Sequence, residues 1–276
     1  MQQVSEHVFI ETKYLGCNVG VVLMEQGPVV IDTPVLPDDT RDLRDQIRKL
    51  TSKRIAYLIY THEHFDHVLG ASGLTKKVVA HYAAVKDIEY LRKDLAGEIK
   101  HFYPGLYKEY KDTLDSLDVV PPQITFVNEM TLYAGSRKLE LSWVGGHSPA
   151  SILIYVLADR LLFCGDNVDV GMPFVAPYSR FGEWIDALKR IEGMEIDRIV
   201  PGHGEICGMN DVRRTRIFFE IASDRVQRLI KAGMTKTETI RKIDLADVLY
   251  VPLSPFVKQQ IQVMVGRMWE EIGEDD

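Results

Sequence analysis

The stretch Thr-His-Glu-His-Phe-Asp-His, residues 61–67, places four ligand-type side chains within six positions: His62, His64, Asp66 and His67. Imidazole and carboxylate groups at this density are typical ligands of zinc and related divalent ions. A bound divalent ion lowers the pKa of water and so supplies hydroxide near neutral pH. The heptapeptide therefore predicts metal-assisted catalysis. The alternative is a polar helix start in which Asp66 is a cap and the histidines are solvated.

The spacing of these ligands favours two metal ions over one. Residues 55–60 form an apolar, β-branched and aromatic run that predicts a buried strand, so the ligands follow on a loop at its end. His62 and His64, two positions apart, can face one ion, whereas Asp66 and His67 can face another. A single ion would use only part of the set.

Three further ligand-type residues follow predicted strands, each next to a glycine. His147 comes after residues 138–144, Asp166 after 160–164 and His203 after 198–200. Glycine allows the backbone to turn sharply and to approach a compact site. Each residue taken alone has a structural alternative as a capping or turn residue. Their order downstream of the heptapeptide predicts that all three belong to the same site.

Taken in order, these motifs resemble the metallo-β-lactamase-fold superfamily, which also has an Asp after an early strand, here Asp32. The resemblance covers about residues 4–206. It implies an α/β fold, a four-layer αβ/βα sandwich in which two sheets face each other and the metals lie at one rim. It also implies that Asp32 holds the motif loop without binding metal, a role that orients the ligands themselves.

The resemblance further implies a complete ligand set. His62, His64 and His147 would hold the first metal, Asp66, His67 and His203 the second, and Asp166 would bridge both. Asp at position 166 distinguishes the chain from the β-lactam-degrading enzymes that have a Cys ligand there. His at position 64 distinguishes it from the di-iron flavoproteins, which have Glu. We expect two zinc ions, with iron or manganese as alternatives, because this donor set suits all three metals.

The expected activity is hydrolysis of a carbonyl-centred bond in a small molecule by a hydroxide that bridges the metals. Asp166 would set the metal spacing, Asp66 would orient the nucleophile and pass on a proton, and Tyr178 would donate to a developing oxyanion. Lactone, thioester and lactam are the candidate bonds, in that order. A thioester hydrolase similar to glyoxalase II is disfavoured, because residues 167–173 lack the glycine- and arginine-rich stretch of that enzyme. The alternative is an oxidoreductase similar to the persulfide dioxygenases, whose single iron needs two His and one Asp.

The order of predicted elements divides the chain into a domain at 1–208, with a helical insertion at about 82–118, and a helical C-terminal extension at 209–276. Strand-rich runs with interspersed helices in each half of the first part fit two sheets flanked by helices. The expected strands are 8–11, 19–25, 29–32, 55–60, 125–127, 138–144, 152–157, 160–164 and 198–200, and the expected helices are 38–50, 181–191, 211–232, 235–242 and 255–271.

Two segments are candidates for substrate contact. Tyr103, Tyr107 and Tyr110 have spacings that predict one helix face, which would be a wall over the metals or, alternatively, a face packed on the core. The loop Val170–Tyr178 is apolar, contains Gly and Pro, and directly follows the Asp166 motif. Such a loop is well placed to line a pocket, although it could instead cover a sheet edge.

Composition excludes some partners. The net charge of −7 argues against nucleic acid, whose phosphates are bound mainly by cationic residues. Three scattered cysteines, no signal segment and no apolar stretch of membrane-spanning length predict a reduced, cytoplasmic protein without a membrane partner. The aromatic insertion and residues 256–268 offer apolar surface for a homodimer.

Overall fold

The computed structural model describes residues 1–135 and 137–274, and within them the strands form two sheets. The seven-stranded sheet has the order β1 to β7, and the five-stranded sheet has the order β12-β11-β10-β9-β8. The strands are β1 (Gln2–Gln3), β2 (Val8–Glu11), β3 (Val19–Val22), β4 (Val29–Ile31), β5 (Tyr57–Ile59), β6 (Val78–His81), β7 (Ile124–Phe126), β8 (Glu129–Tyr133), β9 (Lys138–Trp143), β10 (Ile152–Val156), β11 (Leu161–Phe163) and β12 (Arg198–Val200).

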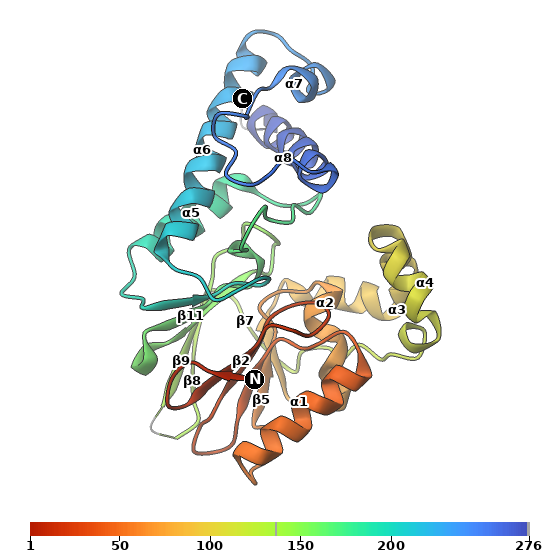
Figure 1. Cartoon of the computed structure of the whole chain (residues 1–276), viewed down its shortest axis with the longest axis vertical. Coiled ribbons are helices and arrows are strands. Elements are labelled where there is room, and N and C mark those ends of the chain that lie inside the picture. Colours follow the sequence, from red (N-terminus) through yellow and green to blue (C-terminus); the bar gives the residue numbers. More distant parts are fainter. Residues whose placement is uncertain (136, 275–276) are drawn as a thin grey trace.

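The helices cover the outer faces of the two sheets, one rim and one end of the molecule. They are α1 (Pro37–Leu50), α2 (Phe65–Val68), α3 (Ala84–Phe102), α4 (Pro104–Leu114), α5 (Phe181–Glu192), α6 (Met209–Lys231), α7 (Lys236–Lys242) and α8 (Pro255–Glu274). Figure 1 shows α1 against the first sheet, α3 and α4 projecting at its side, and α6, α7 and α8 gathered at the opposite end of the molecule.

Three apolar clusters separate these layers. The central cluster combines side chains of both sheets, such as Ile31 and Ile59 from the first and Ile154 and Phe163 from the second. A second cluster joins α1 and α3 to the first sheet, and a third joins α5, α6 and α8 to the second. The order is helices, sheet, sheet, helices, which confirms the predicted αβ/βα sandwich.

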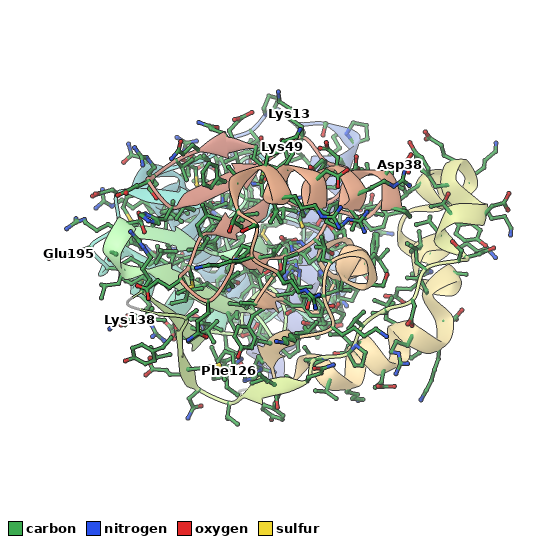
Figure 2. All side chains as sticks on the ribbon, turned by 90° about the horizontal axis from the view of Figure 1, so that it is seen from below. Lys13, Asp38, Lys49, Phe126, Lys138 and Glu195 are labelled. Atoms are coloured by element: carbon green, nitrogen blue, oxygen red, sulfur yellow. The ribbon has the colours of Figure 1, made fainter. Side chains whose placement is uncertain are left out.

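Helix α1 shows how the sequence determines an outer layer. Pro37 begins it, as suits a residue without a backbone N–H in the first turn. Leu43 and Ile47, four positions apart, are buried against the sheet. Viewed from below in Figure 2, the charged side chains of Asp38 and Lys49 lie near its two ends, on the exposed side of the layer.

The strand directions bring several strand ends to one rim. β4 and β5 are parallel, with Ile31 paired to Ile59, and β11 and β12 are parallel, with Phe163 paired to Val200. β9 runs in the same direction as β11, because both are antiparallel to β10. The loops that leave β4, β5, β9, β11 and β12 therefore start at neighbouring ends of the two sheets.

The expected elements differ from the structure mainly by omission. β1, β6 and β8 have no counterpart among the expected strands. β8 is an exposed edge strand with partly polar residues, so it lacks the buried apolar run on which strand predictions rely. Helix α7 begins at a capping box, because Thr235 accepts a hydrogen bond from the Glu238 backbone and the Glu238 carboxyl bonds back. Among the described residues, the helices lack an apolar stretch of the length required to cross a bilayer.

Candidate metal centre

The seven predicted ligands come together at the rim from five separate segments. His62 and His64 lie on the loop after β5, Asp66 and His67 in α2, His147 after β9, Asp166 in a short 3₁₀ turn after β11, and His203 after β12. Their donor atoms form two groups in which all atoms lie within 4.8 Å of one another. One group is His62, His64, His147 and Asp166, and the other is Asp66, His67 and His203.

Asp166 lies between the two groups. Its Oδ2 is 3.6 Å from His147 Nε2 and 3.4 Å from His203 Nε2, and its Oδ1 is 3.1 Å from His67 Nε2. The carboxylate therefore reaches histidines of both groups, as a bridging ligand must. The side chain is only 3% exposed, which removes bulk water from the middle of the site.

Four of the five histidines face the site through the same ring nitrogen. In each, Nδ1 lies near an outer oxygen: Thr61 Oγ1 for His62 at 3.1 Å, Asp32 Oδ2 for His67 at 2.9 Å, the Phe174 carbonyl for His147 at 3.1 Å and the Gly16 carbonyl for His203 at 3.0 Å. A carbonyl or carboxylate oxygen only accepts, and the Thr61 hydroxyl is already committed as a donor to Asp32. Each Nδ1 therefore carries the hydrogen, which leaves the Nε2 lone pair for a metal.

His64 has the opposite orientation. Its Nε2 is hydrogen-bonded to the hydroxyl of Tyr178, and its Nδ1 lies 3.0 Å from His147 Nε2. Tyr178 thus holds the ring so that Nδ1 faces the site. The sequence-based assignment of Tyr178 as an oxyanion donor remains a prediction, but the observed contact of its hydroxyl is with a ligand ring.

Asp32 orients the motif loop, as the resemblance implies. Its Oδ1 accepts from the Thr61 backbone at 2.7 Å, while its Oδ2 accepts from the Thr61 hydroxyl at 2.7 Å and from His67 at 2.9 Å. The backbone at Asp32 has a φ of 56°, a conformation that costs energy in a residue with a side chain. The buried hydrogen bonds compensate for this strain and fix His67 in place.

Glycine is required where the backbone passes the bridging carboxylate. A Cβ at Gly202 would lie 1.9 Å from Asp166 Oδ1, so a larger residue would displace the ligand. Gly165, the residue before Asp166, has a φ of 50°, and a Cβ there would lie 2.7 Å from Thr61 Oγ1. These two glycines allow the strand ends of β11 and β12 to approach the motif loop closely.

The electrostatics differ between the two groups. Burial lowers the pKa of His62, His64 and His147, that of His64 to about 3, so these rings are neutral and can act as ligands. Burial opposes the ionisation of Asp66, yet the charges of His67 and His203 outweigh it and lower the pKa of Asp66 to about 2. Burial likewise opposes protonation of His203, but the Asp166 charge raises its pKa to about 12. The carboxylates around His203 therefore favour a positive charge at its Nε2, which a bound cation would supply in place of a proton.

The donor set fits bound divalent metal ions. His62 Nε2, His67 Nε2 and Asp166 Oδ1 are buried and have no hydrogen-bond partner. Buried polar atoms without partners are rare and costly, and here they converge on one another. Imidazole nitrogens and carboxylate oxygens at these positions would satisfy two cations of the zinc, iron or manganese type.

Several polar residues around this centre were not singled out from the sequence. Asn167 fixes the His147 loop, because its Oδ1 accepts from the His147 backbone and its Nδ2 donates to Gly145. Buried Asp169 accepts from the His203 backbone at 3.1 Å. Cys17 is buried and donates to the Thr33 carbonyl, and burial raises the pKa of its thiol. Proximity of Asn167 and Asp169 to Asp166 in sequence was the only available signal for them.

Two cavities lie beside the ligands, with volumes of about 220 Å³ and 440 Å³. His64, Phe65, Asp66, Tyr103 and Phe174 line both. The loop Val170–Tyr178 contributes to each, and its backbone at Val175 donates to buried Gln260 of α8. Helix α8 thus holds one wall of these two cavities in position.

The three tyrosines of the insertion have different surroundings. Tyr103 lies at the junction of α3 and α4, not within a helix, and its ring contacts Phe65 and Phe174 at centroid distances of 5.1 and 6.2 Å. Tyr107 is buried and donates to Asp115, and all three tyrosines belong to or pack against the cluster that joins α1 and α3 to the first sheet. Only Tyr103 also lines the two cavities, so the alternative of a face packed on the core describes Tyr107 and Tyr110.

A His and Asp cluster of this kind, at the rim of an αβ/βα sandwich, is a candidate site for two metal ions. The chain belongs to the metallo-β-lactamase superfamily, whose family model matches residues 13–203.

Individual relatives are distant. A linear primary-alkylsulfatase of Pseudomonas sp. is 23% identical over 259 residues, covering 80% of this chain and 48% of the relative. A type 2 metallo-β-lactamase of Bacillus cereus is 23% identical over 220 residues, covering 75% and 77%. The structure of a stereoselective inverting sec-alkylsulfatase from Pseudomonas sp. superposes with a TM-score of 0.77 at 15% identity, covering 97% of this chain and 49% of that one. The chain thus spans about half the length of these alkylsulfatases.

Proposed function

We propose that this protein hydrolyses a carbonyl-centred bond, in a lactone, thioester or lactam, of a small molecule that is not anionic. The observation that supports the proposal most directly is the lining of the two cavities beside the ligands. It is largely apolar and aromatic, and it includes no lysine or arginine among the described residues. A substrate bound there is held by apolar contact and by the metals, not by a cationic side chain.

The ligand residues have distinct roles in this proposal. His62, His64 and His147 would hold one ion, Asp66, His67 and His203 the other, and Asp166 would contact both. When bound, the ions would supply Lewis acidity and a water molecule acidic enough to ionise near neutral pH. Asp66 is the ligand carboxyl that lines both cavities, so its Oδ atoms can also receive a proton and return it to the leaving group.

The aromatic wall would orient the substrate. Phe65, Tyr103 and Phe174 form a continuous group of ring contacts next to His64 and Asp66. Rings in such a group exclude water and fix an apolar portion of the substrate, so that its carbonyl is presented to the ligands. The supporting hydrogen bond from Val175 to Gln260 keeps Phe174 close to this position.

Sulfate-ester hydrolysis is the second candidate. Its support is the structural likeness to the sec-alkylsulfatase, which covers 97% of this chain and so includes the C-terminal helices. Against it stands the lining without lysine or arginine among the described residues, because a sulfate group is bound most strongly by cationic side chains.

Elemental analysis followed by a substrate panel tests these proposals. We expect two metal ions per chain, zinc in the first place, and turnover of at least one uncharged lactone, thioester or lactam. A primary and a secondary alkyl sulfate belong in the same panel, and Asp166→Ala is the inactive control. Exclusive turnover of the sulfates would replace the first candidate with the second. One iron per chain with oxygen uptake would instead support the oxidoreductase alternative.

Zinc, a cytoplasmic location and a homodimer stay predictions from the sequence.

A further inference from the structure

We infer that the cavity of about 220 Å³ binds a cationic organic group of the substrate, a protonated amine or a quaternary ammonium. The inference rests on the proposed function, because it concerns the substrate of the same site. Glu63, Asp87 and Glu98 line this cavity, and none of them belongs to the ligand groups described above.

The three carboxyl groups come from two elements and differ in depth. Asp87 is exposed and Glu98 is half-buried, both on α3, whereas Glu63 of the motif loop is only 4% exposed. Glu63 Oε2 accepts a hydrogen bond from Ser148 at 2.8 Å, but Glu63 Oε1 is buried and has no partner. A buried carboxyl oxygen without a donor gives this wall of the cavity a negative potential, which a positively charged occupant compensates.

Aromatic rings complete the lining. Tyr90, Tyr103 and Tyr178 line the same cavity as the three carboxyl groups. The face of an aromatic ring attracts cations, and rings together with carboxylates are the usual surroundings of an alkylammonium group. Uncharged apolar occupants would use the rings but would leave the carboxyl groups without compensation.

Cationic side chains do not neutralise this lining from within. Among the described residues that line the cavity there is no lysine or arginine. The positive charges that act on the carboxyl groups from outside it are those of Lys86 on Asp87, of His101 on Glu98 and of His67 on Glu63. Lys86 is exposed and does not line the cavity, so the interior of the cavity keeps an excess of carboxyl groups.

A small metal ion is not the expected occupant. In the described chain, the sets of His, Cys, Asp and Glu donor atoms that lie within 4.8 Å of one another do not include Glu63, Asp87 or Glu98. The carboxyl groups are therefore too widely spaced for one ligand shell. An organic cation, which is larger and interacts with ring faces, matches both the spacing and the volume.

The position of the cavity gives this cation a role in specificity. His64 and Asp66 line it together with the carboxyl groups, so a cation bound there lies next to the ligand cluster. A substrate that carries an ammonium group a few bonds from its carbonyl would occupy the cavity and present the carbonyl to the metals. The same lining would repel carboxylate and sulfate groups.

Calorimetric binding of choline and of neohexyl alcohol, its uncharged carbon isostere, to the purified full chain tests the inference. We expect choline to bind at least about tenfold more tightly, because the two molecules differ essentially in charge. Equal affinity for the two, or a preference for the alcohol, would overturn the inference whether or not the protein is active.

Variants on α3 locate the interaction. Asp87→Asn and Glu98→Gln should each weaken choline binding about 3- to 5-fold, since both are at least partly solvated, and Tyr90→Leu about threefold. The matched control is Glu89→Gln on the same helix. It removes the same charge, but Glu89 pairs with Arg92 and does not line the cavity. Equal weakening by the control would show a general field effect and contradict the assignment. Circular dichroism checks that each variant is folded.

Hydrolysis of acetylcholine and neohexyl acetate separates this inference from the proposed function. A higher kcat/KM for acetylcholine that Glu98→Gln abolishes supports both. Equal kcat/KM for the two esters would overturn the inference and leave the hydrolase in place. Selective choline binding without turnover of any carbonyl substrate would support the cavity assignment and contradict the proposed function.

Discussion

The ligand cluster and the adjacent cavity wall are built in different ways, although His64 and Asp66 belong to both. In the cluster, His67 and His147 are fully buried, and each of the five histidines has an outer partner for the ring nitrogen that faces away from the site. In the wall, Tyr90 is 56% exposed and Tyr178 is 42% exposed. The histidines of the cluster are therefore fixed by burial and hydrogen bonds, whereas part of the wall is exposed to solvent.

This difference teaches where chemistry and specificity lie. Fixed ligands suit a reaction that needs one metal geometry, because misplaced donors lose most of their value. The exposed side chains of the wall, such as Tyr90, can change with little cost in stability, since surface substitutions usually change the free energy of unfolding by less than about 0.5 kcal/mol. We therefore expect substitutions in the cluster to affect metal binding and those in the wall to affect substrate binding.

The largest effect is expected from Asp166→Ala. Loss of the carboxylate that reaches histidines of both groups should abolish turnover and lower the metal content measured by elemental analysis. The matched control is Asp186→Ala, an exposed aspartate on α5. Full activity and full metal content in Asp166→Ala would contradict the assigned cluster. His62→Ala should behave like Asp166→Ala.

Asp32→Asn tests the outer contacts of the cluster. An amide in place of the carboxylate weakens the bonds to His67 and Thr61, so we expect metal affinity about 10- to 100-fold lower. Competition with a chromophoric chelator measures this change. Asp38→Asn, an exposed aspartate in the first turn of α1, is the control. An unchanged affinity would mean that His67 is fixed by packing alone.

Tyr178→Phe distinguishes the two roles of the residue at the border between cluster and wall. If the hydroxyl mainly orients His64, metal affinity should fall about 2- to 10-fold and kcat should change in proportion to occupancy. If it mainly stabilises an oxyanion, kcat at full metal loading should fall about 10²- to 10³-fold with metal affinity unchanged. Measuring metal affinity by chelator competition and kcat at saturating metal separates the outcomes, and the contact with His64 favours the first.

The smallest effect is expected in the wall. Tyr103→Leu removes the ring contacts to Phe65 and Phe174, so KM should rise about 2- to 10-fold with metal content unchanged. Tyr110→Leu is the matched control, because it alters the same insertion at a residue that does not line either cavity. A fall in metal content in Tyr103→Leu would show that wall and cluster are coupled.

Much of the fold and of the ligand set could be predicted because its signals are local. Buried strands such as β5 and β11 are short apolar runs followed by ligands. Each pairs in parallel with a neighbour in its own sheet, β5 with β4 and β11 with β12, so the ends of each pair lie at the same edge. The exposed edge strand β8 left no comparable signal, because an edge strand is stabilised by its neighbour and cannot be read from a short window. The break at Tyr103 does have a local signal, because Pro104 follows it and the residue before a proline is disfavoured in a helical conformation.

The sequence by itself determined which donor atoms this protein possesses and that glycine stands beside three of them, because ligand chemistry belongs to single side chains. Only the tertiary structure decided which ring nitrogen of each histidine faces the site. His203, for example, is oriented by the carbonyl of Gly16, 187 residues away along the chain. The approach of Asp87 and Glu98 on α3 to Glu63 was likewise decided by packing. Contacts between distant segments depend on how layers stack, and that information is distributed over the whole chain.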